Sequence, residues 1–571
     1  MGVPRTAVVW LSLTLGEFAL GQHPKLHPEL LGTDADEVVN VIVRYKPDKT
    51  SAQDAVDTRM STRGAILRHK LPLLHAASFS MSRRDLELLA ADPEVEYVAP
   101  DRRVRATAFR GTADYGWMAV TGIYAPSGTL LYDGTGIAVA VIDSGIHDRE
   151  DLKDPGGHSR IVYKESFVST DNHPDDFYGH AVHVIGIIAG SGKKSTGNHY
   201  DYTIRGIAPN ANIVSLRVLD KYGAGTDSAV IAAIQRAIQL KDTYNIRVIN
   251  LSLGRPVYGS YQNDPLCQAV EQAWKAGIVV VVSAGNGGRD NSAGTEGYAT
   301  ITAPGNDPYV ITVGAMNTVG TLSRADDKIT SYSSKGPTLI DHVVKPDLVA
   351  PGNRILSLRD NGSYLDNTYA ANRVPVYVYS TETGTSTPDY FQLSGTSMAA
   401  PMVSGAAALL LQKNPSWTPD QVKAVLMKSA SKFAQTFSMS VDPVSGATYT
   451  SQYDIFTIGA GYLDIQTALA CNDVVTGTAQ SPSATYDSAS GNVYLVNDPA
   501  AVWDTNAIWG SNAIWGSNAI WGSNVIWGSN AIWGSSGASD GFAAIWGPTS
   551  IWASGTPITS DADSVSVDGD N

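Results

Sequence analysis

IAVAVIDSG, residues 137–145, is an apolar run that ends in an aspartate and a Ser-Gly turn. An apolar run this short, bounded by turn residues, is typical of a strand buried on both faces. Similar runs follow as RVIN at 247–250, IVVVVSAG at 278–285 and YVITVGA at 309–315, and helical stretches at 180–190, 227–241 and 264–276 separate them. This alternation predicts an α/β domain with three α/β/α layers and a mostly parallel sheet.

Reactive side chains stand where these strands end or helices begin. Asp143 ends the first strand, His180 opens an apolar helix, and Ser397 precedes the alanine-rich stretch MAAPMVSGAAALLL. Acyl transfer by serine needs a base, a carboxylate that orients the base, and donors for the oxyanion. Taken singly, the three residues are explained as a turn former, a structural histidine and a helix cap. Together they follow one known chain order of a catalytic triad, Asp, His, Ser.

On these residues, the region 137–470 resembles the subtilase family of serine endopeptidases. VAVIDSGI at 139–146 is similar to the family's aspartate motif, GTSMAAPMVSG at 395–405 to its serine motif, and SAGN at 283–286 to its oxyanion segment. The resemblance implies a subtilisin-like fold and the following roles: Asp143 orients, His180 is general base and acid, Ser397 is the nucleophile, and Asn286 donates to the oxyanion with the Ser397 backbone N–H.

Two further segments resemble the parts of the family that hold a protein or peptide substrate. One contains Gly223, Ala224 and Gly225, and the other contains Ser252, Leu253 and Gly254. The resemblance implies that an extended peptide is added as a strand between them, a mode in which main-chain hydrogen bonds give affinity and pockets give selectivity. Without the resemblance, glycines at 223 and 225 indicate only a surface turn.

The histidine segment departs from the family pattern HGTHVAG. It reads HAVHVIG from His180, so that Ala181, Val182 and Ile185 replace glycine, threonine and alanine. The valine removes a hydroxyl and the isoleucine adds volume to a packed interior. All reactive groups remain, and we expect an active serine endopeptidase. The alternative is a catalytically impaired subtilase-like surface or binding protein; a sedolisin-type acid peptidase is disfavoured because a histidine base acts near neutral pH.

Residues 37–105 predict a separate small α+β, ferredoxin-like module. Strands are expected at 38–45, 73–81 and from 95, and helices at 52–67 and 84–91. The module resembles the inhibitory propeptide of the family, which implies that it is an intramolecular inhibitor and that maturation cuts between Val104 and Asp114. The peptidase domain would then span 112–470. The alternative is an independent accessory domain.

The first 21 residues predict export. Arg5 precedes an apolar stretch from Thr6 to Leu20, and small residues stand around its end at Ala19 and Gly21. This arrangement is typical of a secretory signal peptide, the alternative being a buried N-terminal helix. No later run reaches the roughly 18 apolar residues of a membrane-spanning helix. We therefore expect a secreted, extracellular protein without a membrane span.

The remaining segment, 471–571, is an acidic tail with a hexapeptide repeat. NAIWGS recurs between Asn506 and Gly534, and a period of six keeps its tryptophans on one face of a strand but not of a helix. Short strands, a low-complexity segment and a stacking surface for sugars or a partner all stay open. Most of the net charge of −14 comes from the C-terminal part of the chain, because the last basic residue is Lys432 and twelve Asp lie beyond it. This charge gives no reason to expect a nucleic-acid partner.

Neither a disulfide nor a cofactor can be assigned from the sequence. The chain has two cysteines, Cys267 and Cys471, which either pair or stay free. Many subtilases bind calcium, but the loop 191–202 has no cluster of acidic ligands. We therefore assign no cofactor and no metal ligand, and structural calcium stays open.

Overall fold

The computed structural model of the chain describes residues 25–31, 34–46, 50–106, 121, 132–380, 387–474, 477–487, 492–496 and 569–570. The expected signal peptide at 1–21 and the NAIWGS repeat lie outside the described residues. The predictions made for those two segments therefore stay predictions.

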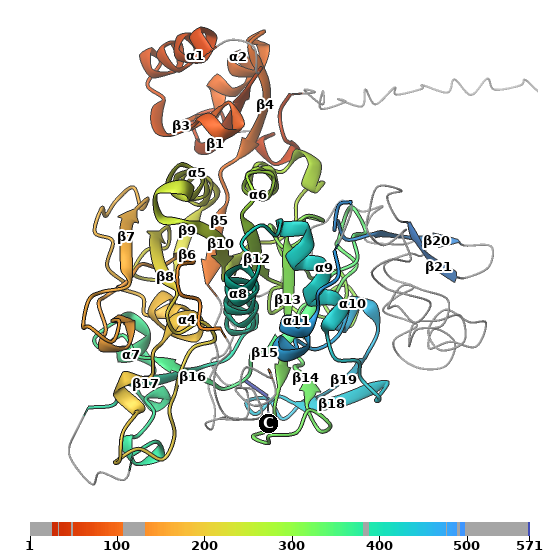
Figure 1. The fold of residues 1–571 in the computed structure, drawn as a ribbon. Coiled ribbons are helices and arrows are strands. Elements are labelled where there is room, and N and C mark those ends of the chain that lie inside the picture. The colour runs from red at the N-terminus through yellow and green to blue at the C-terminus, as the bar shows by residue number, and fades with distance from the viewer. Residues whose placement is uncertain are drawn as a thin grey trace, which may run out of the picture.

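A mostly parallel sheet forms the centre of the larger domain (Figure 1). Its strand order is β14-β13-β12-β10-β6-β8-β7, with β15 beside β13, and only the β13–β14 pair is antiparallel. The strands are β6 Ala138–Asp143, β7 Ile161–Ser166, β8 Asn212–Arg217, β10 Ile246–Leu251, β12 Val279–Ser283, β13 Ile311–Asn317, β14 Lys328–Ile329 and β15 Leu348–Pro351. The four apolar runs of the sequence are therefore strands β6, β10, β12 and β13.

Two pairs of helices cover the sheet. Helices α4, His180–Ala189, and α8, Thr396–Lys413, pack against each other, and so do α5, Asp227–Tyr244, and α6, Pro265–Lys275. The two pairs lie on opposite sides of the sheet (Figure 1). Helices α9, Pro419–Ser429, and α11, Ile465–Ala470, pack beside α8. The predicted three-layer α/β/α architecture is confirmed.

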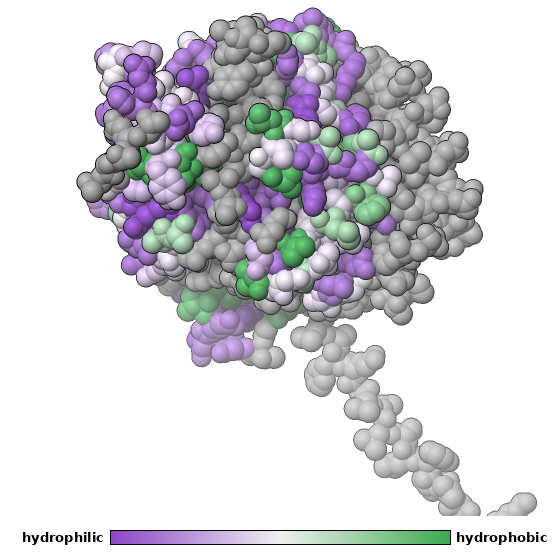
Figure 2. Space-filling model, turned by 90° about the horizontal axis from the view of Figure 1, so that it is seen from below, coloured by the Kyte–Doolittle hydropathy of each residue, from purple (hydrophilic) through white to green (hydrophobic). Residues whose placement is uncertain are grey.

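Shorter elements surround this core. The elements are α7 Tyr364–Thr368, β16 Ile355–Leu358, β17 Tyr390–Leu393, β18 Phe437–Val441, β19 Thr448–Gln452, α10 Ile455–Ile458, β20 Ser483–Asp487 and β21 Asn492–Val496. Figure 2 shows hydrophobic residues of one face as separate patches among hydrophilic ones. Within the described ranges, no helix has the length and apolarity needed to cross a bilayer.

Both cysteines are unpaired. Cys267 lies fully buried in α6, where its thiol donates to Asn306 Oδ1 at 3.3 Å. Burial raises the pKa of the Cys267 thiol well above its ordinary value, so this side chain packs as a small neutral group.

The N-terminal module is an antiparallel sheet of order β2-β3-β1-β4 with two helices (Figure 1). Its elements are β1 Val38–Tyr45, α1 Thr50–Thr62, β2 Ile66–Leu71, β3 Ala76–Ser82, α2 Leu86–Ala91 and β4 Val95–Pro100. The predicted α+β module is confirmed, with one correction. The first helix ends at Thr62, and ILRHKL forms strand β2 instead of a helix end, because Gly64 at φ +91° turns the chain.

The module's sheet is covered on both faces. In β1, Val41 and Val43 join the module's own core, whereas Ile42 joins the core of the larger domain. This alternation follows from the period of two along a strand. Strand β2 packs on α5, and the turn after it packs on α6. From that turn, the Leu73 N–H donates to Gln235 Oε1 in α5 at 3.1 Å. The module is thus docked on the helix pair α5–α6.

We expect Gly405→Ala to destabilise the larger domain. A Cβ at 405 in α8 would lie 2.5 Å from the Cβ of Ile207, and a clash near the backbone typically costs about 1–3 kcal/mol. Helix propensity alone favours alanine by about 1 kcal/mol. The sign of the change in the free energy of unfolding therefore distinguishes the clash from the propensity effect. Urea unfolding of a Ser397→Ala chain with and without the Gly405→Ala substitution measures it. A Gly405→Ala chain as stable as its parent would contradict this packing.

Candidate active site

The ends of three neighbouring strands bring polar residues to one edge of the sheet. Strand β10 lies between β6 and β12, with Asn250 beside Val141 and Leu251 beside Val282. Asp143 is the last residue of β6, Ser252 follows β10, and Asn286 lies three residues beyond the end of β12. The carboxyl ends of parallel strands share an edge, which is where such folds place functional groups.

His180 is the first residue of α4 and contacts Asp143. Its Nδ1 lies 2.9 and 3.0 Å from the two carboxylate oxygens of Asp143, and both side chains are fully buried. The Ser144 N–H donates to Asp143 Oδ1 at 2.7 Å, which fixes the carboxylate. His180 Nε2 is buried without a hydrogen-bond partner in the part of the chain that the structure describes. An imidazole held in this way keeps Nε2 available for proton transfer.

Asp176, which the sequence analysis did not single out, holds the start of α4. Its carboxylate accepts from the Gly179 N–H at 2.7 Å and from the Val182 N–H at 2.9 Å. These bonds satisfy two of the N–H groups that a helix N-terminus leaves without an intrahelical acceptor. Burial, followed by the negative charge of Asp360, raises the pKa of Asp176 to about 7. An aspartate four residues before the candidate histidine is the signal that could have predicted this cap.

Ser397 is the second residue of α8, and its hydroxyl donates to the Ser252 carbonyl oxygen at 3.0 Å. Ser252 Oγ in turn donates to the Ser397 carbonyl oxygen at 2.9 Å. The hydroxyl bond recorded here is therefore directed to Ser252 and not to His180. Because α4 and α8 pack against each other, the helices that carry the two candidate groups are neighbours. A change of the Ser397 χ1 rotamer redirects the hydroxyl.

The side chain of Asn286 is oriented by the residue before Ser397. Asn286 Oδ1 accepts from the N–H and from the hydroxyl of Thr396, both at 3.0 Å. Its Nδ2 is buried and has no hydrogen-bond partner among the described residues. A buried amide donor without a partner requires an explanation. Here the amide is bonded to the residue before the candidate serine, so the oxygen of a molecule bound at that serine would be placed to accept from Nδ2.

The two glycine-containing segments flank an extended strand of this same chain. Strand β5, Arg103–Ala106, lies between β9, Ala224–Thr226, and β11, Leu253–Gly254, and is antiparallel to both. In β5, position 105 pairs with Ala224 on one side and with Gly254 on the other. Gly223 adopts φ +76° just before β9, and Tyr178 fills the space a Cβ would need.

The three departures in the histidine segment are accommodated by the core. Ala181, Val182 and Ile185 are almost fully buried among apolar residues. The Val182 N–H donates to Asp176, and the Ala181 N–H donates to Ser144 Oγ at 3.0 Å. A threonine hydroxyl is therefore not needed to hold this turn of the helix.

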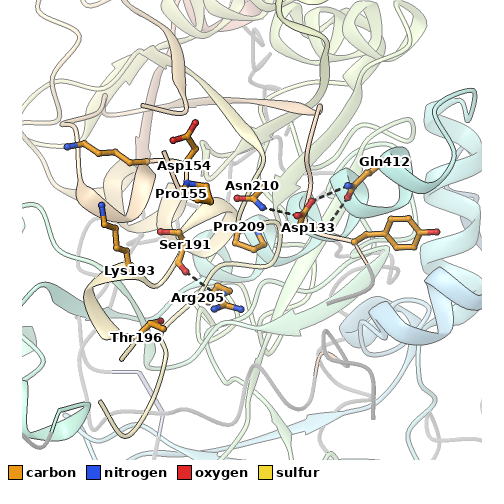
Figure 3. A pocket seen from close by; sticks show the side chains of 12 residues that line it. Asp133, Asp154, Pro155, Ser191, Lys193, Thr196, Arg205, Pro209, Asn210 and Gln412 are labelled. Carbon is orange, nitrogen blue, oxygen red and sulfur yellow. Dashed lines mark hydrogen bonds between the residues drawn. The ribbon is translucent and has the colours of Figure 1, made fainter. Parts of the chain in front are cut away.

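A pocket lies away from these residues. Its volume is about 610 Å³, and it is bordered by Ser191, just beyond the end of α4, and by Gln412 in the last turn of α8 (Figure 3). His180 and Ser397 stand at the opposite ends of the same two helices. Along the lining of the pocket, the Asp133 carboxylate accepts hydrogen bonds from Asn210 Nδ2 and from Gln412 Nε2. Within the described residues, no cluster of three metal-ligating side chains occurs.

A parallel α/β sheet with an aspartate, a histidine and a serine at its carboxyl edge is typical of serine hydrolases. Residues 134–461, more than half of the chain, match the profile of the subtilase family. The chain belongs to this family of serine endopeptidases.

Two curated relatives and one solved structure illustrate the similarity. Serine protease AprX of Bacillus subtilis is 40% identical over 305 residues, covering 52% of this chain and 62% of AprX. Subtilisin E of the same species is 32% identical over 381 residues, covering 66% of this chain and 81% of subtilisin E. Fervidolysin of Fervidobacterium pennivorans, a keratinolytic enzyme related to subtilisin, shares the fold with a TM-score of 0.57 at 23% identity, over 78% of this chain and 63% of fervidolysin.

We expect His183→Gln to weaken the pH dependence of stability. His183 Nε2 lies 3.1 Å from the carbonyl oxygens of Ile355 and Phe391, and burial, with the nearby His180, lowers its pKa to about 3. The unfolded chain takes up this proton near pH 6.5 and the folded chain does not. Stability is therefore lost as the pH falls from 6.5 towards 3, by up to about 1.4 kcal/mol per pH unit.

Urea unfolding of Ser397→Ala chains at pH 7, 6 and 5 measures this effect. Glutamine keeps an N–H donor for the two carbonyls but does not titrate. The stability difference between the His183 chain and the His183→Gln chain should narrow on acidification. A difference that is constant over this range would contradict a neutral, buried His183.

Proposed function

We propose that the chain is a secreted serine endopeptidase, made as a zymogen, that hydrolyses peptide bonds through an acyl-enzyme on Ser397. The observation that carries the proposal is the position of strand β5 between strands β9 and β11. An extended segment of the chain already occupies, by main-chain pairing, the groove expected for a substrate. Secretion rests on the signal-like sequence at 1–21.

In the proposed first step, His180 Nε2 takes the hydroxyl proton of Ser397 as the oxygen attacks the substrate carbonyl carbon. The Asp143 contact at Nδ1 keeps that nitrogen protonated, so Nε2 is the basic nitrogen. The imidazolium that forms is stabilised by the buried Asp143 carboxylate. It then gives its proton to the leaving amine, and water repeats the sequence on the acyl-enzyme.

The negative oxygen of the tetrahedral intermediate is proposed to accept from Asn286 Nδ2 and from the Ser397 backbone N–H. The two bonds to Thr396 hold the Asn286 amide in one orientation before substrate arrives. The Ser397 N–H lies in the first turn of α8, where the helix dipole also favours negative charge. Donors fixed in advance need no reorganisation when the charge develops.

The N-terminal module is proposed to be an inhibitory propeptide. Besides β5, it contributes Asp101, whose carboxylate accepts from the N–H and the hydroxyl of Ser228 at the start of α5. Its sheet packs on α5 and α6, as described above. Position 106 pairs with Leu253, and the residue before Leu253 is Ser252, the hydrogen-bond partner of Ser397. The register therefore favours a cut just beyond Ala106, within the expected window of 104–114.

We expect Ser397→Ala to abolish turnover and self-processing together. Loss of the nucleophile should reduce kcat by a factor on the order of 10⁶. Casein digestion reports turnover, and N-terminal sequencing of the recovered protein reports processing. The exposed Ser159→Ala serves as the control and should behave as the parent chain. A Ser397→Ala protein that still digests casein or still matures would overturn the proposal.

Fluorophosphonate labelling separates this enzyme from the alternative, an impaired binding protein. Only a serine activated by a base reacts with the probe. The parent chain should be labelled at Ser397, whereas an unlabelled but folded parent would favour the binding protein.

We expect Asn286→Ala to lower kcat about 10²- to 10³-fold with little change in KM, because the lost bond forms mainly in the transition state. Steady-state kinetics on a peptide substrate measure both constants, with the exposed Asn198→Ala as the matched control. A rise in KM at unchanged kcat would assign Asn286 to ground-state binding instead.

A further inference from the structure

Asp570, near the end of the sequence, is fully buried against the larger domain. Its Oδ1 accepts from Arg289 Nη2 at 2.8 Å and from Ser331 Oγ at 2.6 Å, and its Oδ2 accepts from the Ser331 N–H at 2.6 Å. Bonds of this kind to a carboxylate are among the stronger ones in proteins. More than two hundred residues separate Asp570 from each partner, so the contact is a docking event and not a local turn.

The backbone of Asp570 is bonded as well as its side chain. Its N–H donates to Asn353 Oδ1 at 2.9 Å, and its carbonyl oxygen accepts from Asn353 Nδ2 at 3.1 Å. Ser331 and Asn353 are themselves buried. Gly569 adopts φ +57°, a conformation that favours glycine. Arg289, Ser331 and Asn353 therefore form a docking site, here called the seat. The seat fits a Gly-Asp pair through the carboxylate, the peptide groups and the backbone conformation of that pair.

The seat joins the loops that hold the candidate active site. Arg289 follows Asn286 by three residues, and this loop runs beside the Ser331 loop. The Gly288 N–H donates to the Tyr332 carbonyl oxygen at 2.8 Å, and the Ser334 N–H donates to the Gly285 carbonyl oxygen at 3.0 Å. Asp570 is bonded to both loops. It therefore joins the two loops, one of which contains the candidate oxyanion donor Asn286.

Asn353 connects the same seat to the serine segment. Its neighbour Gly352 accepts, through its carbonyl oxygen, from the Gly395 N–H at 2.8 Å, and Gly395 immediately precedes α8. The Tyr332 hydroxyl donates to that same Gly352 oxygen at 3.1 Å. A shift of the Asn353 loop would therefore be transmitted to the start of the helix that carries Ser397.

We propose that the Gly569–Asp570 segment is an anchor, and that its docking in the seat of Arg289, Ser331 and Asn353 positions Asn286 and Ser397 for hydrolysis. The inference rests on the proposed function for its catalytic consequence and on the contacts above for the docking itself. Asp570 touches no reacting atom and is a positioning residue. Without it, Arg289 still has the Asp442 carboxylate at 3.1 Å, whereas the Ser331 N–H and Asn353 Nδ2 lose the Asp570 oxygens that accept from them.

The kinetic test compares Asp570→Asn with Asp568→Asn in the full chain, so that both variants lose one negative charge two residues apart. Asp570→Asn should lower kcat about three- to thirtyfold with KM unchanged. Asp568→Asn should match the parent chain. Equal kcat values for Asp570→Asn and the parent, or equal losses for both variants, would overturn the anchor's role in catalysis.

The docking test uses a fluorescent peptide of residues 564–571, SVSVDGDN, and a Ser397→Ala chain that lacks 569–571. Fluorescence anisotropy should give saturable binding, and a peptide with asparagine in place of Asp570 should bind at least tenfold more weakly. Absence of binding would overturn the anchor. In the chain that retains Ser397, the peptide should restore kcat; binding without restoration would overturn the coupling. A parent chain without turnover would overturn the proposed function instead, and the anisotropy result would still decide the anchor.

Discussion

The hydrogen-bonded register of three parallel strands, β6, β10 and β12, is the constraint on which the candidate site depends. Because Asn250 lies beside Val141 and Leu251 beside Val282, the residues that follow these strands emerge in one row. Asp143, Ser252 and the Asn286 loop are in this row. A slip of one residue would turn the side chains of a whole strand to the opposite face. The α4–α8 pair then adds His180 and Ser397 to this fixed edge from one side of the sheet.

Strand addition explains how one surface can serve both restraint and recognition. Under our proposal, β5 and a substrate use the same main-chain positions of β9 and β11, which read the peptide backbone and not its side chains. The module that delivers β5 is held by other contacts as well, through its apolar sheet face and the Asp101 cap. A substrate lacks those contacts. The difference between inhibitor and substrate would therefore lie in what surrounds the shared strand.

The sequence predicted strands β6, β10, β12 and β13, because apolar runs this short, such as 278–285, are bounded by turn residues and separated by helical stretches. It did not predict β2, since ILRHKL alternates exposed and half-buried residues at a sheet edge. The motifs named Asp143, His180, Asn286 and Ser397, and the structure brings their segments together. Asp176 was missed because the motifs mark reactive side chains, whereas its role in capping α4 is indicated only by its position four residues before His180. The seat of Asp570 was missed because its partners lie more than two hundred residues away in the chain.

The two unpaired cysteines have a consequence for how the protein can be handled. A chain with two thiols and no bond between them has no covalent cross-link that a reductant could open. Its tertiary structure does not depend on a disulfide, and Cys267 is shielded from solvent oxidants. Folding should therefore proceed equally in a reducing cytosol and in an oxidising medium. Dithiothreitol can be present throughout purification without loss of structure.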